Sequence, residues 1–224
     1  MIHRFWIRSA AVSALLNQAF PAFATVVAQW NMDNTYGTTM EDSSGNGNDG
    51  TTYDIVTSGG GYIFNGTSSK AVVPHSASLT PGDSDFSWTV QVQTDRIPDV
   101  GTDYDLMRKG TGTKTGGEYK LEIVNVRGKG VAKCVVWDNA AHSATKQGTT
   151  NIADDMLHTI TCSKTSTGLT ITVDALMPLT KAAAVGAITT TLPLTLGVKA
   201  AKATGSTADW YPGNMRSARV SIGP

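Results

Sequence analysis

The chain has 224 residues, of which 40% are hydrophobic and 16% are charged, and its 18 basic side chains are matched by 18 acidic ones. This composition fits a folded chain with a sizeable core and argues against disorder. The balanced charge gives no reason to expect a nucleic-acid partner. Abundant threonine and glycine, without strand–helix alternation, favour an all-β fold over a helical bundle or an α/β enzyme.

Residues 1–24 have the features of a signal peptide. Arg4 and Arg8 precede the apolar run 10–16, and Ala22-Phe23-Ala24 supplies small residues before a cleavage site. The run is shorter than the roughly 20 apolar residues that span a bilayer. The sequence therefore predicts a secreted protein with one domain over residues 25–224 and no membrane span.

Period-two alternation of apolar and polar residues predicts a series of short strands. The segment Phe86–Gln93 alternates without exception, and Leu169–Val173 repeats the pattern. Clusters of glycine, serine and asparagine separate the segments and predict turns. Together they predict a two-sheet antiparallel β-sandwich. The predicted strands are 26–32, 62–64, 70–73, 86–93, 119–123, 131–138, 157–163, 169–173, 188–196 and 215–222.

The turn that begins at Asp42 carries oxygen-bearing side chains at alternate positions. Asp42, Ser44, Asn46 and Asn48 occupy positions 1, 3, 5 and 7, with Gly47 at position 6. This spacing is typical of a chain that wraps oxygen ligands around Ca²⁺, although Tyr53 stands where a bidentate acid would complete the site. The same residues also suit a tight hairpin turn, so both interpretations stay open.

Cys134 and Cys162 both lie in segments predicted as strands, and export favours a disulfide between them. If both side chains point inward, alternation turns Lys133, Val135 and Trp137 outward. By the same argument Lys120 and Glu122 point outward on one strand and Gln91 on another. We predict that these side chains share one sheet and form a glycan-binding surface, on which a sugar ring packs against Trp137.

The order of these segments resembles the laminin G-like domains of the concanavalin A-like jelly-roll family. The resemblance rests on short motifs spread over residues 26–222: Trp30-Asn-Met-Asp33, Tyr62-Ile-Phe64-Asn65-Gly66, Phe86-Ser-Trp88, Leu157-His158 and the closing Tyr211-Pro-Gly213 to Val220. It implies a jelly roll and a structural Ca²⁺ held by Asp33 and Asp209. Trp210 and Tyr211, beside Asp209, form a second aromatic candidate for ligand binding.

We expect a carbohydrate-binding domain, with an extracellular protein as the other partner class. The first alternative is a polysaccharide lyase or glycoside hydrolase on the same fold. Glu118 and Glu122 are roughly 13 Å apart along one strand, too far for a glycosidase pair alone. Tyr104, Arg108, Lys120 and His142 include residue types that a lyase needs, but no motif brings them together. The second alternative is an adhesive, protein-binding module.

Overall fold

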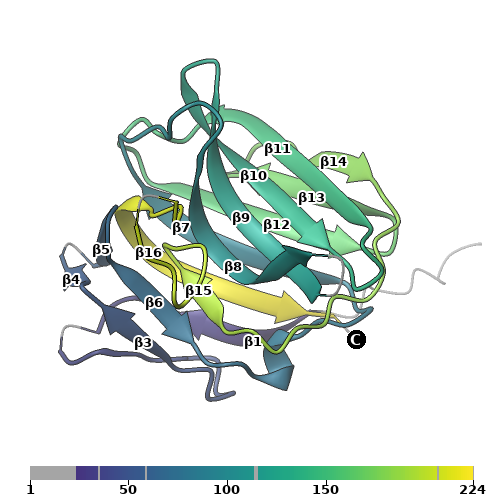
Figure 1. Cartoon of the computed structure of the whole chain (residues 1–224), viewed down its shortest axis with the longest axis horizontal. Helices are drawn as coiled ribbons and strands as arrows, with labels where there is room; N and C mark the ends of the chain where they lie inside the picture. The colour runs from purple at the N-terminus through teal and green to yellow at the C-terminus, as the bar shows by residue number, and fades with distance from the viewer. Residues whose placement is uncertain (1–23, 35, 59, 114–115, 206, 224) are drawn as a thin grey trace, which may run out of the picture.

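The computed structural model describes residues 24–34, 36–58, 60–113, 116–205 and 207–223, so the predicted signal peptide lies almost entirely outside the described residues. Two antiparallel sheets face each other, and each segment predicted as a strand overlaps a strand of these sheets (Figure 1). The one helical element among the described residues is the single 3-10 turn Ala77–Leu79. None of the helices described is long and apolar enough to cross a membrane.

Sheet A contains, in spatial order, β14 (Leu179–Ala182), β13 (Gly168–Val173), β12 (His158–Thr165), β7 (Phe86–Gln93), β16 (Pro212–Ile222), β5 (Tyr62–Asn65) and β4 (Val56–Thr57), and β1 (Thr25–Trp30) also pairs with β16. Sheet B contains β11 (Ser143–Asn151), β10 (Lys129–Trp137), β9 (Gly116–Val126), β8 (Asp103–Thr113), β15 (Leu194–Leu196), β6 (Lys70–Val73), β3 (Gly50–Tyr53) and β2 (Thr39–Met40). The predicted two-sheet antiparallel sandwich is confirmed. Within each sheet, strands that are neighbours in space are often distant in sequence.

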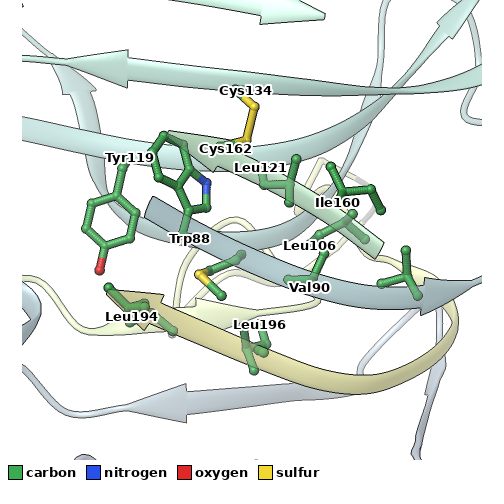
Figure 2. Close-up of a cluster of buried hydrophobic side chains, with 14 of the residues drawn as sticks. Trp88, Val90, Leu106, Tyr119, Leu121, Cys134, Ile160, Cys162, Leu194 and Leu196 are labelled. Carbon is green, nitrogen blue, oxygen red and sulfur yellow. A yellow bond between two sulfur atoms is a disulfide. The ribbon is translucent and has the colours of Figure 1, made fainter. Parts of the chain in front are cut away.

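The core fills the space between the sheets. Trp88 of sheet A and Tyr119 of sheet B meet there with ring centroids 5.6 Å apart, and aliphatic side chains from both sheets surround them (Figure 2). The Tyr119 hydroxyl donates to the Leu79 carbonyl at 3.1 Å, which satisfies its buried polar end. Both sheets thus turn one face inward and leave the other free for function.

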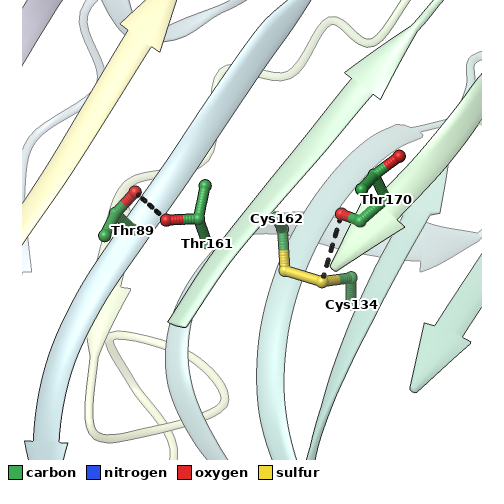
Figure 3. The surroundings of a disulfide bond; sticks show 5 residues. All are labelled: Thr89, Cys134, Thr161, Cys162 and Thr170. Atoms are coloured by element: carbon green, nitrogen blue, oxygen red, sulfur yellow. Dashed lines mark hydrogen bonds between the residues drawn. A yellow bond between two sulfur atoms is a disulfide. The ribbon is translucent and has the colours of Figure 1, made fainter. Parts of the chain in front are cut away.

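The predicted disulfide is present. Cys134 on β10 and Cys162 on β12 are joined, so the bond connects sheet B to sheet A through the core (Figure 3). Both cysteines are fully buried. The bond also fixes the orientation of β10, because an inward Cys134 requires its neighbours in sequence to face outward.

Candidate functional site

The outer face of sheet B, the side turned away from sheet A, carries the candidate site. On β9, Tyr119 and Leu121 enter the core, while Glu118, Lys120 and Glu122 point the other way. The register pairs Trp137 with Glu118 and Lys133 with Glu122. The structure therefore brings four predicted site residues, Lys120, Glu122, Lys133 and Trp137, onto one surface.

Charged side chains on this face form one connected group, which we call the outer-face network: Asp103, Asp105, Arg108, Glu118, Lys120, Glu122 and Lys133. At one end Arg108 reaches Asp105 at 3.1 Å and Glu118 at 2.5 Å. In the middle Lys120 contacts Asp105 at 2.8 Å, Asp103 at 3.1 Å and also Glu122. Lys133 contacts Glu122 at 2.6 Å.

Most of the outer-face network is buried although it lies outside the core. Asp105 is completely buried, and Glu118 and Glu122 are each 2% exposed. Burial raises the pKa of Asp105 to about 7, and Lys120 and Arg108 only partly offset this effect. Burial likewise raises the pKa of Glu118, against the pull of Arg108 and Lys120. These carboxylates therefore depend on their cationic neighbours to remain ionised.

Trp137 borders the network and is partly exposed. Beside it lies Gly112 of β8, where an added Cβ would stand 2.8 Å from the indole Nε1 and 2.7 Å from Glu118 Oε2. A side chain at this position would collide with both groups. Gly112 thus leaves the space in which the indole and the Glu118 carboxylate lie next to each other.

A cavity of about 310 Å³ opens beyond Arg108, at the opposite end of the network from Lys133. Its walls come from β8, from Thr195 of β15 and from the two segments Leu192–Pro193 and 199–202. Lys70 supports the second segment by donating to the Ala201 carbonyl at 2.6 Å. From Trp137 on β10 to Thr195 on β15 the surface crosses three strand spacings, roughly 15 Å at about 4.8 Å each.

The two aromatic residues before β16, which were predicted as a second ligand site, are both largely buried. Tyr211 is fully buried, and its hydroxyl lies 3.0 Å from the carbonyls of Gln93 and Asn214. Trp210 is 8% exposed, and its Nε1 donates to the Gly205 carbonyl at 2.8 Å. Alternation could not have revealed this, because both residues precede the regular part of the strand. Tyr211 belongs to the core and is not available to a ligand, whereas Trp210 lines a surface pocket with Tyr104 and Asp209.

Gln91 also requires a correction, because it does not share a sheet with the other predicted residues. It lies on β7, on the outer face of sheet A, where its Nε2 donates to Thr159 Oγ1 at 3.2 Å and its Oε1 accepts from Ser217 Oγ at 3.1 Å. The sandwich core separates it from Trp137. Alternation correctly turned Gln91 outward, but it does not specify which sheet a strand joins.

The three acids predicted to hold calcium lie in different surroundings. Asp209 lies with Asp103 and Asp105, and one carboxylate oxygen of each falls within 4.8 Å of the others. Asp33 is exposed and is not part of this cluster. The Asp42 carboxylate accepts bonds from the backbone N–H groups of Gln29, Ser44 and Asn48, each at 2.9 Å.

These hydrogen bonds give Asp42 a role within its own loop. Burial works against its ionisation, yet the bonds from the loop lower the pKa of Asp42 overall. Ser44 also donates its hydroxyl to the same carboxylate at 2.8 Å. A cation at this position would have to displace several of these donors.

The sequence reasoning missed the residues of β8 that complete the site. Asp103, Asp105 and Gly112 received no role, and Arg108 entered only among the residue types that a lyase needs. The strand has no clean alternation because its pairing with β9 shifts twice, between Asp105 and Met107 and between Gly110 and Thr113. The remaining sequence signal for this part of the site is the charged pair Asp105 and Arg108, three positions apart, and this signal is weak.

No family model matches this chain, and no curated protein does so. Solved structures, by contrast, do match it. Domain 4 of the extracellular GH43 arabinanase AbnA from Geobacillus stearothermophilus, solved with arabinotriose, has a TM-score of 0.62 at 16% identity, over 89% of this chain and 93% of that one.

A botulinum neurotoxin type C structure, from a study of its interaction with two ganglioside molecules, has a TM-score of 0.63 at 11% identity over 89% of this chain. The binding domain of botulinum neurotoxin DC in complex with rat synaptotagmin II has a TM-score of 0.57 at 8% identity over 88% of this chain. The present chain spans about half the length of both neurotoxin chains, 48% and 47%. At these identities the likenesses establish the β-sandwich fold.

Proposed function

We propose that this protein is a secreted, non-catalytic carbohydrate-binding domain of the laminin G-like jelly-roll type, and that the glycan lies across the outer face of sheet B. The observation that carries the proposal is the partly exposed Trp137 indole beside the Glu118–Arg108 pair. A disulfide between the sheets suits an oxidising compartment outside the cytoplasm. The AbnA domain, with nearly the same extent, was solved with a bound oligosaccharide.

The chemistry of this surface suits a sugar. The apolar face of a pyranose or furanose ring packs on an indole, and its hydroxyls bond to fixed polar groups at the ring edge. Arg108 donates to the Gly110 carbonyl and to Asp105 and forms an ion pair with Glu118, and its guanidinium keeps further N–H groups without a partner among the described residues. The network holds these groups in place before the ligand arrives, which lowers the cost of ordering them on binding.

Replacing Trp137 by alanine is expected to weaken glycan binding at least tenfold, because an aromatic platform of this kind contributes about 2 kcal/mol or more. The melting temperature should change little, since the indole lies outside the core. Affinity electrophoresis on a panel of polysaccharides, arabinan included, measures the first effect, and calorimetry measures the second. Tyr36→Ala removes an aromatic side chain that is 91% exposed elsewhere and serves as the control. A large drop in melting temperature for Trp137→Ala would assign the indole to the core instead.

The same panel tests the alternatives. New reducing ends or unsaturated uronate products would establish a hydrolase or a lyase, and failure to retain any glycan would favour an adhesive, protein-binding module. The geometry speaks against hydrolysis by the two carboxyl groups of raised pKa, because Asp105 is completely buried and Glu118 is 2% exposed. Neither lies within reach of the leaving-group oxygen of a bound glycan.

We further propose that any structural calcium ion binds at Asp103, Asp105 and Asp209. Three carboxylates are suitable ligands for this hard cation. The ion would have to compete with Lys120 and Lys199, which contact Asp105 and Asp209, each at 2.8 Å. Lys199 is 48% exposed along its side chain and free to swing away.

Calcium at ten times its dissociation constant would add about 1.4 kcal/mol to the free energy of unfolding, or roughly 3–6 °C in melting temperature. Asp209→Asn is expected to remove this response, and Asp33→Asn is expected to keep it. A melting temperature that does not respond to calcium in the unaltered protein would contradict the site.

A further inference from the structure

We infer that the cavity beside Arg108 is a subsite for the carboxylate-bearing unit of an acidic glycan, such as a uronic acid. The inference rests on the proposed function and specifies the ligand class of the same surface. Its basis is that basic residues line the cavity and that no acidic residue is among the described lining residues.

Three cationic side chains line the cavity: Arg108, Lys199 and Lys202. None of the described residues that line it is acidic. The carboxylates that pair with Arg108 and Lys199, namely Asp105, Glu118 and Asp209, are not among the residues that line the cavity. A group inside the cavity therefore meets positive charge first, and the low-dielectric walls strengthen that field.

Two of the cations are available to a ligand. Lys202 is exposed, and no described carboxylate lies within ion-pairing distance of it. Arg108 is 9% exposed, lines the cavity and keeps N–H groups that have no partner among the described residues, and a guanidinium binds a carboxylate in a planar, two-pronged arrangement. A carboxylate is a better match for these donors than a neutral hydroxyl.

The remaining walls suit a sugar ring more than a bare ion. Leu192, Pro193, Ala200 and Ala201 supply apolar surface. The volume, about 310 Å³, lies near the lower limit of small-molecule pockets, roughly 300–1,000 Å³. Apolar surface on one side and cations on another fit a uronic acid, whose ring has an apolar face and whose carboxylate projects from its edge.

The cavity and the aromatic platform are connected by a chain of side-chain contacts through Arg108. Glu118 lies opposite Trp137 in the pairing of β9 with β10 and contacts Arg108 in turn. One chain could therefore place a ring on the indole and a uronate in the cavity.

The test measures calorimetric binding of trigalacturonate and of its methyl ester, which has the same backbone without the charge. We expect the acid to bind at least tenfold more tightly than the ester at about 0.05 M salt, and the difference to shrink at about 0.3 M, where charges are screened within roughly 6 Å. Lys202→Gln should reduce the preference to about threefold or less. Lys181→Gln removes the same charge from β14, at the edge of sheet A, and should leave the preference intact.

The outcomes separate this inference from the proposed function. Equal binding of acid and ester, in a protein that still binds a neutral glycan through Trp137, overturns the inference alone. If no glycan of either kind binds, both proposals fall. Inorganic phosphate provides a third outcome. If phosphate competes for the cavity as strongly as trigalacturonate binds it, the cavity is a bare anion site, and the inference is overturned.

Discussion

Replacing Lys120 by methionine is expected to lower the free energy of unfolding at pH 8 by about 3–5 kcal/mol, the range for removing one partner of a buried ion pair. The Lys120 ammonium contacts Asp103, Asp105 and Glu122, and Asp105 is completely buried. Methionine fills a similar volume but supplies no charge, so the loss measures the uncompensated carboxylates. Chemical denaturation monitored by tryptophan fluorescence gives the value directly.

Lys133 provides the matched control, because it belongs to the same network and differs in exposure. Its side chain is 30% exposed and contacts one carboxylate, Glu122. Lys133→Met should therefore cost about 1 kcal/mol or less, as for other solvent-accessible pairs. Equal losses for the two variants would mean that burial of the network contributes nothing.

The loss in Lys120→Met should also shrink as the pH falls. Burial already raises the pKa of Asp105 to about 7 in the folded protein, above the ordinary value of about 4 for an unfolded aspartate. Between these values the folded state holds a proton that the unfolded state has released, so the contribution of Asp105 to stability falls as pH rises from about 4 to 7. Without Lys120 that pKa rises further, and the decline continues to higher pH.

The double variant Lys120→Met/Asp105→Asn tests the origin of this slope. Asparagine keeps the shape of Asp105 and cannot ionise, so the double variant should recover part of the lost stability at pH 8 and lose the added pH dependence. Recovery at pH 5 should be smaller, because Asp105 is protonated there in the single variant. An unchanged slope in the double variant would trace the pH dependence to Asp103 or Glu122.

The fold was predictable where one sheet face is apolar and the other polar. Strand β7 is predicted from the sequence with its observed ends, Phe86 and Gln93, and β13 is predicted almost as well. By contrast, β11 reads Ser-Ala-Thr-Lys-Gln-Gly-Thr-Thr-Asn, an edge strand with few apolar side chains to bury, and it was not predicted. The predicted strand 188–196 shortens to Leu194–Leu196, because only that part pairs with neighbours on both sides.

The residues of the candidate site on β9 and β10 were predictable from the sequence, and those on β8 were not. The inward Cys134 fixed which side chains of β10 face outward, and so placed Trp137 and Lys133 correctly. That Arg108 lies against Glu118 depends on the bulged pairing of β8 with β9, which no local pattern encodes. Sheet membership is non-local in the same way, and for that reason Gln91 was assigned to the wrong surface.

Removing the disulfide with the double variant Cys134→Ala/Cys162→Ala is expected to lower the free energy of unfolding by about 3.6 kcal/mol in the chain-entropy model, and the melting temperature by roughly 7–14 °C. The closed segment is 28 residues long and includes the edge strand β11. Without the bond, the unfolded chain regains the freedom that the loop had removed. The folded state also loses its covalent connection between the sheets.

Reduction separates the effect of the bond from that of the alanine side chains. Both sulfurs are fully buried, so reductant should act on the wild-type protein only as it unfolds, and the native protein should keep its bond for as long as it stays folded. Reductant should bring the wild-type melting temperature down to that of the double variant and leave the double variant unchanged. Two thiols that react in the native, air-oxidised protein would contradict the bond. An unchanged melting temperature in the double variant would mean that packing between the sheets, without the covalent link, holds the sandwich together.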